Sequence, residues 1–436
     1  MSKIIAALTL GCKVNVYDTE AMLEIFAERG YAIGEFEDFA DIYIINTCTV
    51  TNFGDKKSRQ MIRKARRQNP NAIIIAAGCY AQVSPEEIAK IEGINLVIGT
   101  KDRQKIVEFI ENYDTSTGIQ NNVSNIMKER IYEELQVKNL KDRTRAFLKI
   151  QEGCDKFCSY CIIPYARGPV RSRKPEDVMT EVKNFVENDF KEIVLAGIHV
   201  ASYGKDLGNI NLIALLRQVL DLDGIERIRF SSIEPNVVTE EFLQLFRSTE
   251  KICDHLHLSL QSGCDRTLER MNRSYNTEKY RDAVYRLRES KKDIAITTDI
   301  IVGFPNETDE DFEASYNFCK EIGFSKIHVF PYSAKKGTKA AEYPNQIAAN
   351  IKEERSKKMI ELSENLTKVY LNKFINSTVS VLFEKNSEEN IYIGYTTNYI
   401  QVRVESIAQL ENKIIWVKVI RVENDYLTGT IVNDLI

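Results

Sequence analysis

Three apolar runs near the start of the chain indicate buried strands. They lie at residues 3–10, 41–46 and 72–77. Each is short, rich in Ile and nearly continuous in its hydrophobicity, which is the pattern of a parallel strand buried on both faces. Helical patterns follow at residues 16–29, 55–67 and 84–92, with a fourth strand at 95–99. This alternation predicts an open parallel α/β sheet.

Strands and helices alternate again in the middle of the chain. Strands are expected at residues 146–151, 192–196, 227–231, 255–259, 295–302 and 326–330. Helices are expected between them at residues 176–188, 212–220, 239–246, 277–290 and 309–322. Six such units fall short of the eight that close a full barrel, so a partial (β/α)6 barrel is predicted.

A different pattern ends the chain. A long charged helix is expected at 353–375, and five short β-rich segments follow at residues 377–384, 391–397, 400–404, 413–422 and 426–431. Five strands in so few residues predict a small all-β barrel of the oligonucleotide-binding type. The fold class is therefore α/β with a small terminal β-barrel. The expected domains are residues 1–118, 141–371 and 372–436, with a linker at 119–140.

Composition limits the classes of protein that need considering. A chain of 436 residues exceeds one ordinary core, which fits several domains. The hydrophobic fraction of 43% and charged fraction of 28% are those of a globular protein, and no apolar run is long enough for a transmembrane helix. We expect a cytoplasmic protein with no membrane partner. The net charge of −4 gives no global reason to expect nucleic acid, so such a partner would have to meet a local patch.

The nine cysteines are grouped rather than dispersed. Cys154, Cys158 and Cys161 fall within eight residues, and no His lies close enough to complete a zinc site. Ordinary cubane iron–sulfur clusters use four thiolates, so three of them predict a cluster with one iron left open. Coincidental spacing is the alternative, and so close a grouping makes it improbable.

Three further cysteines each follow a predicted strand of the first sheet. Cys12, Cys48 and Cys79 come after the first, second and third strands. The carboxyl ends of parallel strands meet at one edge of a sheet, so these residues are expected to lie together. One strand-end Cys would usually be a packing residue, but three of them favour a second metal site.

The segment KKSRQMIRKARR at residues 56–67 carries seven positive and no negative charges. It can be a solvated helix face, the common meaning of a charge run. It can equally contact RNA phosphates through residues such as Arg63, Arg66 and Arg67, because it begins just after the Cys48 loop. The sequence leaves both interpretations open.

The cysteine motifs carry a resemblance to a known family. The CxxxCxxC spacing with Tyr160 before the last Cys resembles radical S-adenosylmethionine enzymes, and GCDKFCSYCIIPYARGPVRSR is similar to their methylthiotransferase branch. GCKVNVYDTE and NTCTVTN resemble that family's N-terminal domain, and the last segment resembles its TRAM domain. The resemblance covers essentially the whole chain. It implies two 4Fe-4S clusters, a radical one on Cys154, Cys158 and Cys161 and an auxiliary one on Cys12, Cys48 and Cys79.

The resemblance also implies that loops at the barrel's strand ends surround S-adenosylmethionine. Besides Tyr160, the candidates are Gly197, Glu234, Gln261 and Gly303. The glycines permit close backbone approach, while Glu234 and Gln261 offer polar side chains. Each could instead cap a helix or close a turn. His199, His255, His257 and His328 are expected to be ordinary barrel residues, and Cys253, Cys264 and Cys319 are expected to be packing residues.

Among the methylthiotransferases, LGCKVNVYDTE and NTCTVTNFGDKKSRQ are most similar to the branch that modifies N6-threonylcarbamoyladenosine beside the tRNA anticodon. The isopentenyladenosine branch typically has Gln-Met where this chain has Lys13-Val14. A third branch modifies an aspartate of a ribosomal protein. The expected partners are a tRNA anticodon stem-loop, a reductant such as flavodoxin or ferredoxin, and a sulfur donor. Lys13, Arg167 and Arg171 are candidates for binding the substrate's carboxylate, with Arg167 ranked first. A non-catalytic iron–sulfur RNA-binding protein is the alternative of another class.

Overall fold

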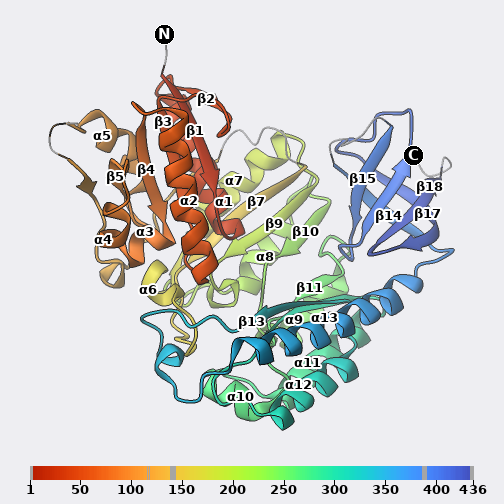
Figure 1. Ribbon diagram of the computed structural model, residues 1–436. Coiled ribbons are helices and arrows are strands. Elements are labelled where there is room, and N and C mark those ends of the chain that lie inside the picture. The colour runs from red at the N-terminus through yellow and green to blue at the C-terminus, as the bar shows by residue number, and fades with distance from the viewer. Residues whose placement is uncertain (1–2, 115, 117, 138–143, 385–389, 433–436) are drawn as a thin grey trace.

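The computed structural model describes residues 3–114, 116, 118–137, 144–384 and 390–432. Strands β9 and β10 of the central part lie between the first sheet, in red to orange, and the terminal barrel, in blue (Figure 1). None of the described helices is long and apolar enough to cross a membrane.

The first part is a six-stranded parallel sheet in the order β2-β1-β3-β4-β5-β6. Its strands are β1 (Ile4–Thr9), β2 (Ala32–Gly34), β3 (Ile42–Thr47), β4 (Ile73–Gly78), β5 (Leu96–Val97) and β6 (Gln120–Asn121). Its helices are α1 (Lys13–Glu28), α2 (Asn52–Gln68), α3 (Cys79–Val83), α4 (Pro85–Ala89) and α5 (Ile106–Glu111). The central strands are buried on both faces, as their continuous apolar runs predicted.

The details of this sheet differ from expectation at three places. Helix α1 begins immediately after Cys12, before the expected position 16. The helix expected at 84–92 is the shorter α4, and the unexpected α3 precedes it, separated by Ser84, whose backbone is not helical. Strand β6 lies within residues 119–140, the segment expected to be a linker, and pairs with β5. Residues 138–140 of that segment lie outside the described residues.

The central part is an arch of six parallel strands. They are β7 (Arg145–Glu152), β9 (Glu192–Gly197), β10 (Arg227–Phe230), β11 (His255–His257), β12 (Ala295–Val302) and β13 (Lys326–Pro331). Regular pairing groups them as β10-β9-β7 and β11-β12-β13, and parallel bridges Ile228–Ile252 and Ile233–Leu258 join the two groups. The short antiparallel β8 (Arg171–Ser172) borders β7. The predicted partial (β/α)6 barrel is confirmed.

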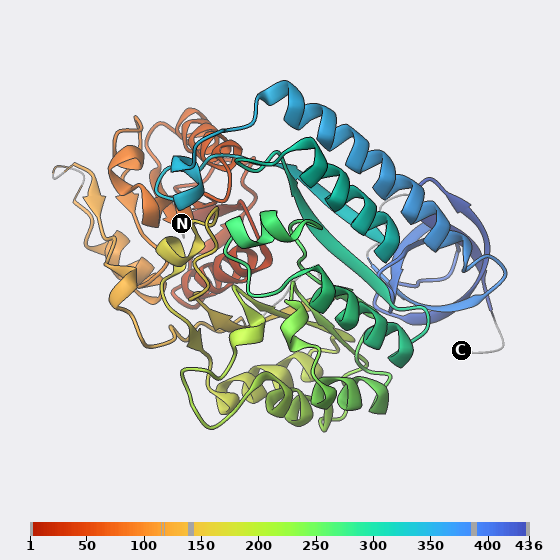
Figure 2. The same ribbon diagram turned by 90° about the horizontal axis from the view of Figure 1, so that it is seen from below.

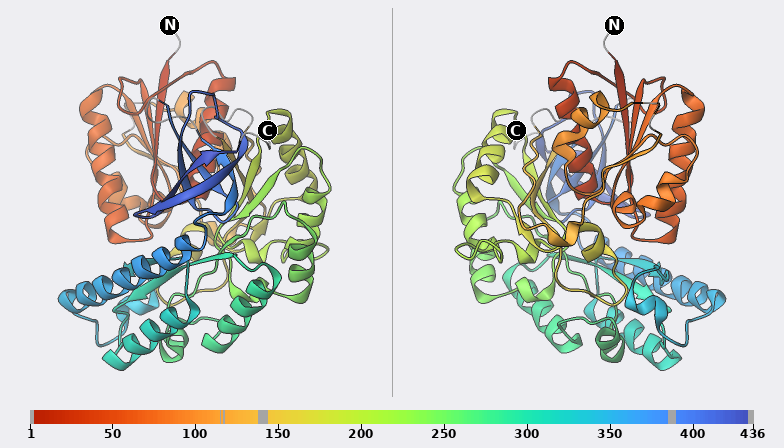
Figure 3. Two further views of the ribbon diagram at one scale, coloured as in Figure 1. Left: turned by 90° about the vertical axis from the view of Figure 1, so that its right-hand side faces the viewer. Right: turned by 90° about the vertical axis from the view of Figure 1, so that its left-hand side faces the viewer.

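Helices cover the outside of this arch (Figures 2 and 3). They are α7 (Pro175–Glu187), α8 (Leu212–Leu220), α9 (Glu240–Ser248), α10 (Asp265–Arg270), α11 (Thr277–Ser290), α12 (Asp309–Ile322) and α13 (Ala349–Asn372). The short α6 (Ile163–Arg167) instead packs against α3 of the first part. One continuous apolar core lies between strands and helices, including Leu148, Leu195, Phe242 and Leu256. Helix α13 then runs to the terminal barrel (Figure 2).

The last part is a closed five-stranded barrel in the order β14-β15-β16-β18-β17. Its strands are β14 (Thr378–Phe383), β15 (Ile391–Thr396), β16 (Gln401–Glu405), β17 (Ile414–Glu423) and β18 (Tyr426–Ile431). Alternate side chains of β15 and β16 are buried, as expected of a small barrel filled by its own side chains. The predicted terminal barrel is confirmed, whereas the exact domain boundaries stay predictions.

Buried charges connect the three parts. Lys149 of β7 lies 2.7 Å from Asp18 of α1 and 3.0 Å from Glu152, and all three side chains are almost completely buried. On the other side of the arch, Arg229 of β10 donates to the backbone oxygens of Thr396 and Thr397 at 3.1 Å. A buried charge without its partner would be strongly destabilising, so these contacts fix how the parts are placed.

Candidate cluster sites and the pocket between them

The first cysteine triplet lies at the carboxyl edge of three adjacent strands. Cys12 follows β1, Cys48 follows β3, and Cys79 begins α3 directly after β4. Cys12 Sγ and Cys79 Sγ both lie 3.9 Å from Oδ1 of Asn15. A Cβ atom added to Gly11 would lie 3.2 Å from Cys48 Sγ, and Gly11 has a φ of +106°. The structure therefore gathers all three sulfurs, and Gly11 lets the Cys12 loop approach Cys48 closely.

The second triplet lies in the loop between β7 and α6. The Cys154 N–H donates to Gly168 O at 3.0 Å, and the Cys161 N–H donates to Cys158 O at 2.9 Å. The Ser159 N–H donates to Met271 O at 3.0 Å, which ties the loop to the end of α10. These bonds hold the three cysteines in a compact turn beside the strand ends of the arch.

Each triplet receives one arginine hydrogen bond. Arg167 Nε donates to Cys79 Sγ at 3.2 Å, and Arg273 Nη1 donates to Cys158 Sγ at 3.3 Å. Guanidinium groups stabilise negatively charged sulfur, which suits thiolates that hold a metal cluster.

The donor sets fit clusters rather than single ions. Among the described residues, no group of three or more His, Cys, Asp or Glu side chains is close enough to hold one metal ion. A tetrahedral single-ion site places its sulfurs about 3.8 Å apart. A four-iron cluster binds its cysteines at separate corners and so places their sulfurs further apart. Burial raises the pKa of Cys79 and Cys154 to about 11 and that of Cys161 to about 12, so cluster binding must displace their protons.

The residues expected around S-adenosylmethionine separate into two groups. Glu234 lies beside the central cysteine loop, 3.3 Å from Lys156, 3.3 Å from His199 and 3.1 Å from Arg273. Burial opposes ionisation, but His199 and then Arg273 and Lys156 outweigh it and lower the pKa of Glu234 to about 2. Gly197, two residues before His199, lines the pocket described below. These two residues therefore lie close to the cluster loop.

The other three candidates have different surroundings. The ring of Tyr160 packs edge-on against Phe304 at 6.4 Å. Gln261 has a φ of +73° and bridges to β12 through its backbone. Gly303 has a φ of +70°, a Cβ there would lie 2.4 Å from the Lys352 side chain, and its N–H donates to Glu307 at 2.9 Å. The role of Gly303 at S-adenosylmethionine stays a prediction.

The ranking of the substrate-binding cations is also wrong. Arg167 is fully buried and its guanidinium is occupied by Cys79, Asn15, Asp18 and Glu152. Arg171 is almost fully buried and donates to the backbone oxygens of Pro169 and Arg167. Both side chains hold the protein together, because each is closed off from solvent and already paired. Lys13, ranked below Arg167, is the candidate that reaches a cavity.

The basic helix α2 contains both exposed cations and one that is bound within the protein. Lys56, Lys57, Arg63 and Arg67 are exposed. Arg66 is not available, because it donates to the backbone oxygen of Gly93 and, at 2.8 Å, to Asn95 Oδ1. Its expected role in RNA contact is therefore replaced by a structural one. Phe53, at the start of the same helix, is 75% exposed.

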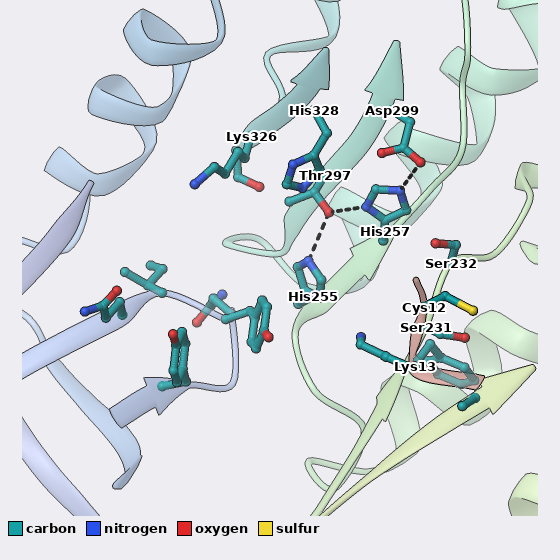
Figure 4. Close-up of a pocket in the computed structure, with 18 of the residues that line it drawn as sticks. Cys12, Lys13, Ser231, Ser232, His255, His257, Thr297, Asp299, Lys326 and His328 are labelled. Carbon is teal, nitrogen blue, oxygen red and sulfur yellow. Dashed lines mark hydrogen bonds and ion pairs between the residues drawn. The ribbon is translucent and has the colours of Figure 1, made fainter. Parts of the chain in front are cut away.

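A pocket of about 850 Å³ lies where the three parts of the protein meet (Figure 4). Cys12 and Lys13 come from the first part, and Ile163, two residues after Cys161, comes from the central part. The terminal barrel contributes residues 395 and 398–401. This volume is that of a typical small-molecule site, and Cys12 of the first triplet opens onto it.

Histidines and hydroxyl groups form one wall of this pocket. His257 lies 3.0 Å from Thr297 and 3.2 Å from Asp299, and Thr297 also lies 3.0 Å from His255 (Figure 4). His255, His257 and His328 all line the pocket, which the expectation of ordinary barrel residues did not anticipate. Their signal is the period-2 spacing in His255-x-His257, Thr297-x-Asp299 and Lys326-x-His328, which places polar side chains on one face of each strand.

Comparison with known proteins agrees with this geometry. Residues 148–319 match the Radical SAM superfamily, and residues 4–99 match the uncharacterized protein family UPF0004. A radical S-adenosylmethionine methyltransferase, TsrM from Kitasatospora setae, shares the fold with a TM-score of 0.55 at 16% identity, over 76% of this chain and 75% of that chain. The fold and the central motif together define a radical S-adenosylmethionine protein.

Relatives that match nearly the whole chain narrow this class of radical S-adenosylmethionine proteins to one family. Threonylcarbamoyladenosine tRNA methylthiotransferase MtaB of Bacillus subtilis is 47% identical over 98% of this chain and 96% of the relative. The tRNA-2-methylthio-N(6)-dimethylallyladenosine synthase of Acetivibrio thermocellus is 35% identical over 99% of this chain and 91% of the relative. The chain belongs to the family of radical S-adenosylmethionine methylthiotransferases that contains both.

Proposed function

We propose that this protein adds a methylthio group to carbon 2 of N6-threonylcarbamoyladenosine at position 37 of tRNA, beside the anticodon. The observation that carries this function is the gathering of two cysteine triplets in one protein, the first of which reaches the pocket through Cys12. Identity of 47% to a relative of that name, against 35% to a dimethylallyladenosine enzyme, supports the choice of substrate.

The cysteines explain why such a reaction is possible here. Bound to the central triplet, a 4Fe-4S cluster would supply the electron that cleaves S-adenosylmethionine to a carbon radical, and a second cluster on the first triplet would hold the sulfur to be methylated and transferred. A radical is needed because a C–H bond of the adenine ring is too weakly acidic for ordinary base catalysis.

The chain's own residues orient the reactants. Tyr160, Gly197, Glu234 and Gln261 are assigned to the S-adenosylmethionine site, beside the central triplet. Glu234 is ionised at neutral pH and fixes Lys156 and Arg273 next to the cysteines. The buried contact of Arg167 with Cys79 holds the first triplet against the arch. Holding the two triplets in one fixed arrangement, with Cys12 at the pocket, converts a multi-component reaction into a positioned one.

The tRNA anticodon stem-loop is assigned to the surface beside the Cys48 loop. Exposed Lys56, Lys57, Arg63 and Arg67 can neutralise phosphates, and exposed Phe53 can stack on an unpaired base. The aromatic residues of the terminal barrel divide between two positions. Tyr395 and Tyr399 line the pocket, whereas Trp416 is 40% exposed outside it.

Two further partners belong to the proposed reaction. Generating the radical consumes an electron, for which flavodoxin or ferredoxin is the expected donor, and the transferred sulfur must be replaced by a sulfur donor. Because the substrate is tRNA, the reaction is placed in the cytoplasm.

Mass spectrometry of tRNA nucleosides tests this function. A strain lacking the protein should lose 2-methylthio-N6-threonylcarbamoyladenosine and accumulate the form without the methylthio group. The purified, cluster-loaded protein should restore it on an anticodon stem-loop. Loss of the methylthio group from isopentenyladenosine, or from a ribosomal protein, would assign the enzyme to another branch of the family. A non-catalytic RNA-binding protein would leave every modification unchanged.

A further inference from the structure

Lys13 occupies an unusual position in the pocket. It directly follows Cys12, and it lies half-buried on the same wall as Cys12, Ser231 and Ser232 (Figure 4). A residue next to a cluster-binding cysteine lies close to the atom that reacts, so its charge acts on the substrate at short range.

The arginines near Lys13 are already paired with carboxylates. Arg145 pairs with Glu384, and Arg229 pairs with Glu192 at 2.6 Å. Both arginines also stack over Tyr399, at 5.3 and 4.5 Å from its ring centre. Among the described residues, Lys13 has no carboxylate within ion-pair distance. A half-buried ammonium without a partner is costly, which is the condition that an anionic ligand relieves.

The proposed substrate carries a suitable anion at a suitable place. Carbon 2 of adenine and the N6 substituent both lie on the Watson–Crick edge, separated by N1 and C6. When carbon 2 faces the first cysteine triplet, a carboxylate on the N6 substituent is therefore only a short distance from Cys12. The pocket's volume of about 850 Å³ accepts the base together with its substituent.

We infer that Lys13 binds the carboxylate of the threonylcarbamoyl group and is the main determinant of this enzyme's choice of N6 substituent. This inference rests on the function proposed above. The free acid gains a charge-assisted hydrogen bond from Lys13, whereas an uncharged substituent of similar size leaves the ammonium unpaired. A site built for a polar partner rejects the analogue that lacks it more strongly than an apolar pocket rejects an added group.

The test uses cluster-loaded enzyme and three anticodon stem-loops. Their adenosine carries threonylcarbamoyl as the free acid, the same group as its uncharged methyl ester, or isopentenyl. For wild-type enzyme, the free acid should exceed the ester in both binding affinity and kcat/KM by about 10- to 100-fold, the range of a charge-assisted hydrogen bond. Binding is followed by fluorescence anisotropy, which does not depend on turnover.

Lys13→Gln should lower the affinity for the free acid to that for the ester and leave the affinity for the ester almost unchanged. The substitution and the esterification remove the same interaction. Lys13→Arg should keep part of the preference for the acid. Lys326→Gln is the matched control, since Lys326 borders the same pocket but pairs with Asp425 at 3.5 Å, and the ratio of acid to ester should stay at the wild-type value. Iron content of each variant shows that both clusters are loaded.

The outcomes separate the two proposals. If wild-type enzyme modifies the threonylcarbamoyl substrate but binds acid and ester equally, the assignment of Lys13 fails while the function stands. An undiminished preference for the acid in Lys13→Gln has the same meaning. If the enzyme modifies only the isopentenyl stem-loop, the proposed function itself is wrong. Equal binding of acid and ester by wild-type enzyme needs no variant to overturn the assignment, and Lys13→Arg attributes a preference for the acid to Lys13 where Lys13→Gln fails to fold.

Discussion

Arg167 Nε donates a hydrogen bond to Cys79 Sγ at 3.2 Å, although the two residues lie in different parts of the fold. Arg167 ends the short helix that follows the central cysteine loop, and Cys79 belongs to the first triplet. The same guanidinium pairs with Asp18 at 2.8 Å and with Glu152. One fully buried side chain therefore fixes the first cysteine triplet against the arch that holds the second.

Replacing Arg167 should affect both stability and the first triplet. Arg167→Gln keeps a hydrogen-bond donor but leaves Asp18 and Glu152 short of a positive charge, which we expect to cost about 3–5 kcal/mol in unfolding free energy. Removal of the hydrogen bond to Cys79 should also lower the reduction potential of the cluster bound there. Urea unfolding and redox-monitored electron paramagnetic resonance measure the two effects.

Arg63→Gln is the control for this experiment, because Arg63 is exposed on α2. Its unfolding free energy should stay within about 0.5 kcal/mol of wild type. A stable Arg167→Gln protein with an unchanged potential would show that the hydrogen bond to Cys79 has no consequence for the cluster.

Hydrophobic patterning was sufficient to predict the order and type of most elements. Cys12, Cys48 and Cys79 could be placed together because each follows a strand, and parallel strands end at one edge. The burial of Arg167 could not be predicted, since it depends on how the segment after Cys161 docks onto Asp18 and Asn15 of α1. Such contacts between distant segments leave no local pattern.

Other differences between the predicted and the observed structure have local causes. Strand β6 is only Gln120–Asn121, too short and polar to produce an apolar run, so its segment resembled a linker. Arg66 belongs to the basic run by sequence, but the turn of α2 directs it to Gly93 and Asn95 instead of solvent. Charge alone does not tell which face of a helix is free.

The two triplets should have separable functions. Substituting Ala for Cys12, Cys48 and Cys79 should halve the iron content after anaerobic reconstitution and abolish methylthio transfer. Cleavage of S-adenosylmethionine to deoxyadenosine should continue, because the cysteine loop after β7 is intact. Substituting Cys154, Cys158 and Cys161 should halve the iron as well and abolish cleavage itself. Methylthiolated product from the first variant would disprove the role of Cys12, Cys48 and Cys79 in sulfur transfer.

Helix α2 offers a test of RNA binding with an internal control. Arg63→Gln and Arg67→Gln remove exposed charges, so the slope of log K for tRNA binding against log salt should lessen by roughly 0.7 to 0.9 for each phosphate that is no longer neutralised. Arg66→Gln should instead lower stability and leave the slope unchanged, because Arg66 is bound to Gly93 and Asn95. Equal slopes for all three variants and wild type would make α2 a solvated face.

The ion pair of Glu192 with Arg229 should make the attachment of the terminal barrel sensitive to acid. Burial alone would raise the pKa of Glu192, but Arg229 at 2.6 Å outweighs it and lowers that pKa below the ordinary 4.5. A carboxyl group whose folded pKa is depressed stabilises the protein fully above its unfolded pKa, and this contribution disappears as the pH falls through 4.5 toward the folded value. Protonation of Glu192 would leave Arg229 buried beside the oxygens of Thr396 and Thr397 with its charge uncompensated.

Glu192→Gln should therefore be destabilised at pH 7 by about 3–5 kcal/mol, and the difference in unfolding free energy between wild type and variant should shrink below pH 4.5. Urea unfolding of both proteins from about pH 7 to about pH 3 measures this difference, and a gap that stays constant across that range would show that the pair does not titrate with folding.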